Sequence, residues 1–213
     1  MALPVFAGRF FSTADPTLAD MVAQLDSRAV REFPQLADGS IAGLLRLRPI
    51  ASPRGGRGLF LADEARLDKD TCVALYHGDI SAQPPAGAYV ADLGSFRRHG
   101  VPYDLSVDAG VLCRQRRPPL TNAGLFNHTC SGATVYPRYL SRWPIPCIAA
   151  FVPAGTPPGS QLCWSYDGGR PGSAYTLSAA AAAQAAAGGT AVMPCCCASP
   201  DPCPRQRWLL QRD

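Results

Sequence analysis

The sequence predicts a mainly β fold that is built from short strands in several small sheets. The 213 residues include 21 prolines and 20 glycines, which interrupt long helices. Short apolar runs recur from Leu47 onward and are separated by polar turns, as is typical of strands. No strongly periodic helical segment lies between these runs, so an alternation of parallel strands and helices is not indicated.

The N-terminal residues 1–46 differ from the rest and are predicted to form a helical appendage that packs on the main domain. A helix is expected to begin near Asp15, because three apolar side chains then recur at helical spacing: Leu18, Val22 and Leu25. A second, short helical turn is predicted at 41–45.

The main domain is predicted to span residues 47–170. Its expected strands are six apolar runs: Gly58–Ala62, Thr71–Tyr76, Ala88–Leu93, Val111–Cys113, Cys147–Val152 and Gln161–Trp164. An alanine- and glycine-rich stretch over 171–193 is predicted to be a linker, since glycine pairs stop alanine helices. Residues 194–213 are predicted to form a cysteine-rich tail.

The charge pattern and the chain ends narrow the class of protein. The formal net charge of +4 is mild, and the densest basic cluster, Arg114–Arg117, is shorter than the runs that indicate nucleic-acid binding. The first residues have neither the charged leader nor the apolar core of a signal peptide, and no run is as long as a membrane helix. We therefore expect an intracellular protein without a membrane segment, and no direct nucleic-acid binding is evident from the sequence.

The nine cysteines fall into two groups. Four lie singly in apolar runs and are predicted to be buried thiols: Cys72, Cys113, Cys147 and Cys163. The C-terminal cluster supplies three thiolates to a predicted zinc site: Cys195, Cys197 and Cys203. Zinc takes four tetrahedral ligands in a closed structural site, so the fourth must come from elsewhere, and Cys130 is the candidate. Cys196 is a spare thiol that could replace a neighbour, and a redox-labile tail without metal is the alternative.

Four segments in a fixed order carry a resemblance to a known family. They are Gly56–Phe60, the Asn-His-Thr-Cys run at 127–130, Trp164–Gly168 and the C-terminal cysteine cluster. In this order they resemble the SET-domain protein lysine methyltransferases with a post-SET zinc motif. The resemblance covers roughly residues 47–208. It implies a SET fold with pseudoknot-like threading around Asn127, and a post-SET zinc loop that uses Cys130 as its fourth ligand.

The resemblance implies methyl transfer from S-adenosylmethionine to a lysine side chain of a protein, a histone tail above all. Such a displacement depends mostly on positioning and electrostatics. The implied catalytic residues line a lysine channel: Tyr76, Tyr103, Trp164 and Tyr166. Tyr166 falls on the near-invariant tyrosine of the family, whereas Tyr89–Leu93 competes with the segment at Tyr103. The bulk of Trp164 predicts mono- or at most dimethylation.

The implied cofactor site combines a glycine turn with residues far along the chain: Gly56, Arg57, Gly58, Asn127, His128, Tyr166 and Trp208. Glycine permits the close backbone approach that such a turn needs. The family also implies a location in the nucleus on chromatin, that of a host cell if the lineage is viral. Two other interpretations stay open, because the family's arginine before Asn127 is absent. One is an inactive SET-like scaffold that binds a histone tail or another protein, and the other is an interaction protein that shares only the cysteine cluster.

Overall fold

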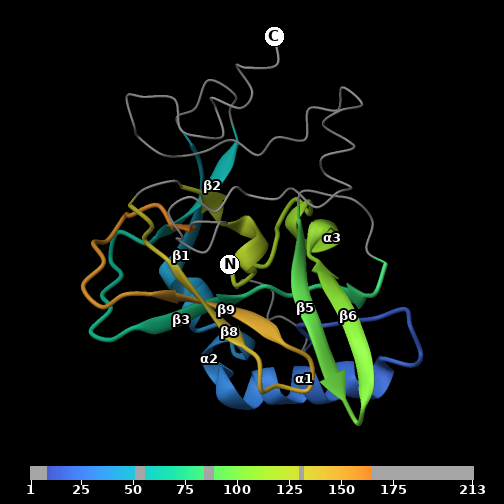
Figure 1. Cartoon of the computed structure of the whole chain (residues 1–213). Coiled ribbons are helices and arrows are strands. Elements are labelled where there is room, and N and C mark those ends of the chain that lie inside the picture. Colours follow the sequence, from blue (N-terminus) through green and yellow to red (C-terminus); the bar gives the residue numbers. More distant parts are fainter. Residues whose placement is uncertain (1–8, 51–55, 84–88, 130–131, 165–213) are drawn as a thin grey trace, which may run out of the picture.

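The structure is a computed structural model that describes residues 9–50, 56–83, 89–129 and 132–164. It is mainly β, with small sheets that are antiparallel except for one pair (Figure 1). The helices are α1 (Ala19–Glu32), α2 (Pro34–Ala37), η1 (Ile41–Leu44), α3 (Gly110–Cys113) and η2 (Ala123–Leu125). The strands are β1 (Leu45–Pro49), β2 (Arg57–Leu61), β3 (Thr71–Leu75), β4 (Asp79–Ser81), β5 (Val90–Arg98), β6 (Val101–Asp108), β7 (Asn127–His128), β8 (Tyr136–Leu140), β9 (Cys147–Val152) and β10 (Cys163–Trp164). The predicted linker and tail at 171–213 lie outside the described residues.

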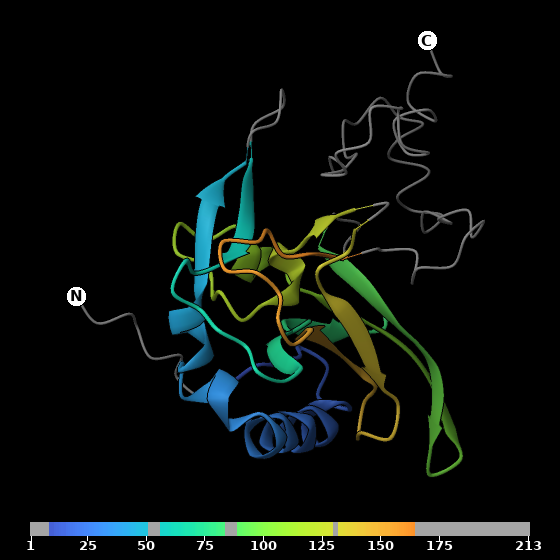
Figure 2. The same cartoon turned by 90° about the vertical axis from the view of Figure 1, so that its left-hand side faces the viewer.

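Helix α1 confirms the helix that was predicted near Asp15. It begins at Ala19, after Leu18, and buries one face made of Met21, Val22, Leu25 and Ala29. These side chains join the same core as the sheets, and Figure 2 shows α1 lying along one end of the molecule. η1 occupies the predicted second turn, and no helix among the described residues is long and apolar enough to cross a membrane.

Two three-stranded antiparallel sheets form most of the body. One has the order β3-β9-β8 and the other the order β4-β6-β5. β3 pairs with β9 and β4 pairs with β6, so both strands are hydrogen-bonded to segments that lie far along the chain. Near the N-terminus, Ser12 extends the second sheet, because its backbone N–H donates to Gly78 O at 3.0 Å and its carbonyl accepts from Ile80 N at 2.8 Å. The N-terminal region is therefore hydrogen-bonded into the main domain.

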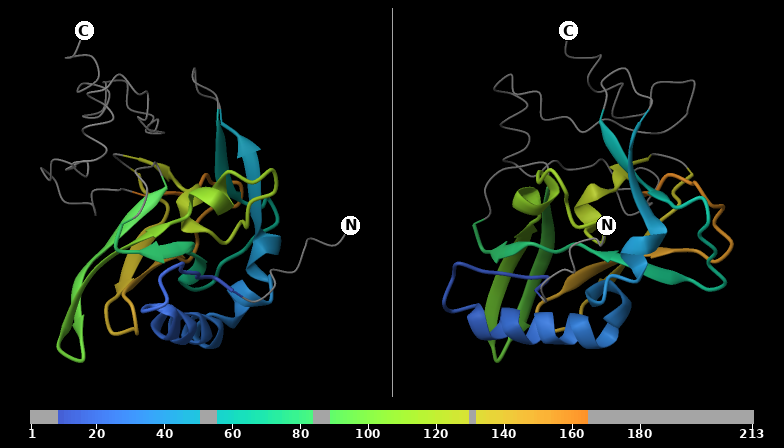
Figure 3. Two further views of the ribbon diagram at one scale, coloured as in Figure 1. Left: turned by 90° about the vertical axis from the view of Figure 1, so that its right-hand side faces the viewer. Right: turned by 180° about the vertical axis from the view of Figure 1, so that it is seen from behind.

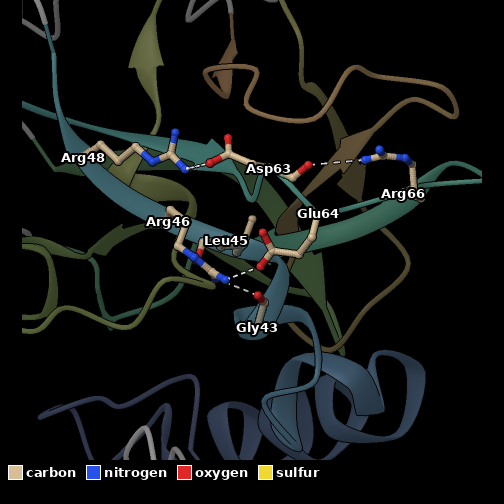
Figure 4. A network of polar contacts seen from close by, with 7 residues as sticks. All are labelled: Gly43, Leu45, Arg46, Arg48, Asp63, Glu64 and Arg66. Carbon is tan, nitrogen blue, oxygen red and sulfur yellow. Dashed lines mark hydrogen bonds and ion pairs between the residues drawn. The ribbon is translucent and has the colours of Figure 1, made fainter. Parts of the chain in front are cut away.

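The β1–β2 hairpin projects from the body, as Figure 3 shows most clearly from behind. Exposed ion pairs brace its base against the residues that follow β2 (Figure 4). Arg46 Nη2 lies 2.5 Å from Glu64 Oε1, and Arg48 Nη2 lies 2.8 Å from Asp63 Oδ2. The hydrogen bond from Arg48 lowers the pKa of the Asp63 carboxyl. Exposed pairs of this kind stabilise the fold little.

The sequence prediction was wrong for Val111–Cys113, which forms part of the helix α3 rather than a strand. The side chain of Asp108 accepts a hydrogen bond from Gly110 N at 2.7 Å and so starts this helical turn. Val111 is 71% exposed, which a buried strand would not allow. Three apolar residues in a row are too short a pattern to separate a strand from one turn of helix.

The four cysteines that were predicted to be buried thiols are buried. Burial raises the pKa of the thiols of Cys72 and Cys113 to about 12, and it also raises that of Cys147. A thiol with such a pKa carries almost no thiolate at neutral pH, so these cysteines serve the core rather than chemistry.

Candidate functional site

The parallel pair of β7 and β10 is the centre of the candidate site. Asn127 pairs with Cys163 and His128 with Trp164, and Thr129 N donates to Trp164 O at 3.0 Å. Parallel neighbours need a long connection between them. The pairing therefore places the Asn-His run directly beside the segment that ends at Trp164, although more than thirty residues separate them in the sequence.

Strand β2 joins this pair through the residues that lead into β10. Leu61 N donates to Ser160 O at 2.9 Å, and Leu162 N donates to Leu59 O at 2.7 Å. The side chain of Asn127 adds a direct link, because its Nδ2 donates to Arg57 O at 3.2 Å. Three segments that the resemblance assigned to one site are thus held together by hydrogen bonds.

Gly56, just before β2, and Gly58, within β2, are glycines for two different structural reasons. Gly56 has a φ of +120°, in the region that favours glycine. At Gly58 a Cβ atom would lie 2.8 Å from both Ile50 Cγ2 and Gln161 Nε2, and 3.1 Å from Asn127 Nδ2. The missing side chain at Gly58 thus lets Asn127 and Gln161 approach the strand closely.

A small aromatic cluster lies next to the β7–β10 pair. The ring of Tyr76 stacks on Trp164 with centroids 6.3 Å apart, and Phe126 meets Trp164 edge-on at 5.5 Å. All three rings are buried. The backbone N–H of Tyr76 donates to Ile148 O at 2.8 Å, which fixes the end of β3 beside β9. The structure therefore brings Tyr76 and Trp164 into contact.

The second described tyrosine of the expected channel, Tyr103, lies in the long β5–β6 hairpin. Its ring is half-buried and stacks on Phe96 of the paired strand, with centroids 5.4 Å apart. Tyr103 lies near the turn of this hairpin, where Arg98 Nη2 donates to Gln24 Oε1 of α1 at 2.7 Å. Its ring contact is thus with Phe96 rather than with Tyr76 or Trp164.

The residue after Tyr76 has a structural role. His77 is fully buried and packs edge-on against Phe10, with ring centroids 5.4 Å apart. Burial lowers the pKa of His77 to about 4, against an opposing backbone hydrogen bond with Phe10. The imidazole is therefore neutral at pH 7 and is not a proton carrier at that pH.

Sequence reasoning missed Asn122, which positions the segment beneath the site. Its buried side chain donates from Nδ2 to His77 O at 2.9 Å and accepts from Gly124 N at 2.9 Å. Asn122 also bridges to Leu75 at the end of β3. The available signal was the Asn-Ala-Gly sequence, since asparagine commonly bonds the backbone two residues onward in a turn.

Several predicted site residues lie outside the described residues. They are Tyr166, Trp208, Cys130, Cys195, Cys197 and Cys203. His128 is placed by its backbone pairing with Trp164. Within the described ranges, no group of three or more His, Cys, Asp or Glu side chains could hold a metal ion. The zinc site therefore stays a prediction.

Comparison with protein-family models and with curated proteins finds no match to this chain.

Proposed function

We propose that the protein transfers a methyl group from S-adenosylmethionine to a lysine side chain of a protein, with a histone tail as substrate. The observation that supports this proposal is the assembly of three distant segments at one place: the turn at Gly56–Gly58, the Asn-His run of β7 and the segment ending at Trp164. Such a convergence of motifs on one site is expected of a binding site rather than of an incidental sequence match.

The residues at the glycine turn suit the amino-acid end of this cofactor. Gly56 and Arg57 are exposed, and glycine at position 56 lets a ligand approach the backbone closely. Asn127 directs Nδ2 to Arg57 O, and its Oδ1 has no donor among the described residues, so this oxygen can accept from an ammonium group. S-adenosylmethionine, when bound, supplies an electrophilic methyl group.

The aromatic residues would act on the lysine. Tyr76 and Trp164 form a packed apolar wall, which disfavours a charged ammonium and so favours the neutral amine that attacks. Tyr103 would line a more distant part of the path. The hydroxyl of Tyr166, two residues after Trp164, would orient the amine by a hydrogen bond. His128 and Trp208 would complete the cofactor site, the latter by covering it.

Zinc would hold the C-terminal tail against the domain. The donor set of Cys130, Cys195, Cys197 and Cys203 is all thiolate, which matches a closed structural zinc site. Its role would be to fold the tail rather than to take part in methyl transfer.

The test is a radiolabelled methyl-transfer assay with purified protein, zinc-replete buffer and mixed core histones. Tyr166→Phe is the test variant. Tyr136→Phe is the matched control, because Tyr136 lies in β8, in another sheet than the β7–β10 pair, and its hydroxyl contacts Asp70. Label on one histone that is lost in Tyr166→Phe and kept in Tyr136→Phe is the expected result.

Binding of S-adenosylmethionine, measured by calorimetry, separates the remaining outcomes. Cofactor binding without label on histones would keep the proposal of a methyltransferase and exclude histones as its substrate. Neither label nor binding would overturn the proposal in favour of an inactive scaffold.

A further inference from the structure

A polar groove lies between α1 and the loop before β9, and none of the predicted site residues lines it. It has a volume of about 430 Å³ and is lined by Ala23, Gln24, Ser27, Arg28, Arg31 and Pro144. α1 lies at the end of the molecule opposite the projecting β1–β2 hairpin (Figures 1 and 2). The groove is therefore far from the glycine turn and independent of the proposed methyl transfer.

Arginines from three separate segments lie at or next to this groove. Arg28 and Arg31 line it, Arg98 contacts two of its lining residues, and the backbone oxygen of Arg142 accepts from Arg28. Arg98 of β5 donates from Nη1 to Pro144 O at 3.1 Å and from Nη2 to Gln24 Oε1 at 2.7 Å. Both acceptors are neutral, so the charge of Arg98 is not compensated by them. Arg31 is exposed and makes no hydrogen bond or ion pair with any described residue, and the same is true of the Arg142 side chain.

Two acidic side chains of α1 lie near these arginines: Glu32, which forms an ion pair, and exposed Asp20, one turn before Gln24. Arg28 Nε lies 2.7 Å from Glu32 Oε1, and its Nη1 donates to Arg142 O at 3.2 Å. Glu32 and Asp20 thus offset two of the four arginines, and the groove keeps a net positive charge. These arginines come from distant parts of the sequence, so no basic run in the sequence indicates the positive charge of the groove.

The lining of the groove selects among anionic ligands. Its apolar lining residues are Ala23 and Pro144, so it lacks the deep apolar pocket that holds the anchor of a bound peptide. Trp143 is buried beneath Arg28, whose guanidinium lies 5.3 Å from the ring centroid, so this ring cannot stack on an unpaired base. Guanidinium groups on an exposed polar surface match phosphate oxygens, which they bind in a fixed fork geometry.

From this arrangement we infer that the groove binds the phosphate backbone of double-stranded DNA, without reading its sequence. The arginines of α1, β5 and the loop before β9 neutralise phosphates, and Gln24 and Ser27 add polar contacts at the same surface. Such binding releases counterions and therefore weakens steeply as salt increases.

The test is fluorescence polarisation of a labelled mixed-sequence duplex of about 20 base pairs, with sodium chloride varied from about 50 to about 200 mM. The test variant is Arg31→Gln/Arg142→Gln, which breaks no described contact. The matched control is Arg116→Gln/Arg117→Gln, which removes the same charge from exposed residues after α3. Thermal melting of each variant checks that the fold is kept.

Salt-dependent binding by the wild type is the expected result. Affinity of the test variant is expected to fall about tenfold, and the slope of log K against log salt by about 2, which corresponds to two lost phosphate contacts. The control is expected to keep most of the affinity. The inference is overturned by a wild type that does not bind the duplex, by equal losses in both variants, or by tighter binding of a glutamate-rich peptide of the same charge.

Discussion

The phenol ring of Tyr76 lies parallel to the indole of Trp164, with a centroid distance of 6.3 Å and an interplanar angle of 9°. Tyr76 directly follows β3 and Trp164 ends β10, and these two strands belong to different sheets. This contact therefore joins the sheet of the body to the short parallel pair that carries the Asn-His run.

The first prediction concerns the packing of Trp164. Its ring is 6% exposed and contacts both Tyr76 and Phe126, so Trp164→Ala is expected to lower the free energy of unfolding by about 3–5 kcal/mol. Trp164→Phe keeps an aromatic ring at this place and is expected to lose less than half of that. Urea unfolding of both variants measures the difference. A loss in Trp164→Ala as small as that in Trp164→Phe would contradict the packing described here.

The second prediction rests on the proposed methyl transfer. A tryptophan in the channel wall leaves little room for a methylated amine, so the product is expected to be mono- and dimethyl-lysine. Intact-mass analysis of a methylated peptide gives the distribution, and mainly trimethyl product would exclude this role of Trp164. In Trp164→Phe the smaller ring is expected to shift the distribution toward higher methylation.

The third prediction separates two roles of Asn127. Asn127→Ala and Asn127→Asp both remove the hydrogen bond to Arg57 O, so each is expected to lower stability by about 1 kcal/mol. Only Asn127→Asp keeps an oxygen that can accept from an ammonium group. Calorimetry with S-adenosylmethionine should therefore show weaker binding in Asn127→Ala than in Asn127→Asp. Equal binding by the two variants would argue against contact between this oxygen and the cofactor.

The fourth prediction concerns Gly78, which follows Tyr76 and His77. A Cβ atom there would lie 2.1 Å from the backbone oxygen of Asp108, which cannot move without shifting β6. Gly78→Ala is expected to destabilise the fold by at least about 1–3 kcal/mol. Gly43→Ala is the control, because a Cβ at Gly43 meets nothing within 4 Å. Thermal melting compares the two variants. Similar melting midpoints would show that the backbone of Asp108 does not lie close to Gly78.

The fifth prediction follows from the low pKa of His77. Because burial lowers this pKa from 6.5 to about 4, the unfolded chain binds the proton more readily than the folded chain. This difference does not affect stability above about pH 6.5. Stability is lost as the pH falls from 6.5 toward 4, by about 3 kcal/mol in total from this residue. Unfolding measured across this range gives the slope.

A matched pair of variants assigns that slope to His77. His77→Leu removes the titrating group and should flatten the dependence between pH 6.5 and 4, whatever its overall stability. His99→Gln changes an exposed histidine in the β5–β6 turn and should keep the dependence. The same slope in all three proteins would show that other groups cause it.

The sequence allowed part of the fold to be predicted, for reasons that are visible in individual strands. β2, β3 and β9 are mostly buried, so continuous apolar runs revealed them. β8 was missed because its Tyr-Pro-Arg-Tyr-Leu sequence is half-exposed and contains a proline. The strand expected at Ala88–Leu93 extends in the structure to Arg98, since the polar second half of β5 pairs with β6.

The candidate site could be predicted only through the resemblance. No local sequence pattern indicates that the Asn127 side chain donates to Arg57 O. A hydrogen bond between distant segments produces no periodic pattern in the sequence of either segment. Asn122 has a local signal for its turn with Gly124, but its bond to His77, 45 residues away, leaves none. The arginines of the α1 groove also become a cluster only in three dimensions.

The pairing of β3 with β9 has a consequence for synthesis of the chain. β3 is almost entirely apolar, yet β9 begins about 70 residues after β3 ends. At ribosomal speeds of about 5–20 residues per second, this strand waits roughly 4–14 s before β9 has been made. During that interval an apolar segment with free backbone groups is open to other chains. Nascent molecules on crowded polysomes would therefore need a chaperone at this stage, and slower translation after β3 would lower the yield of native protein.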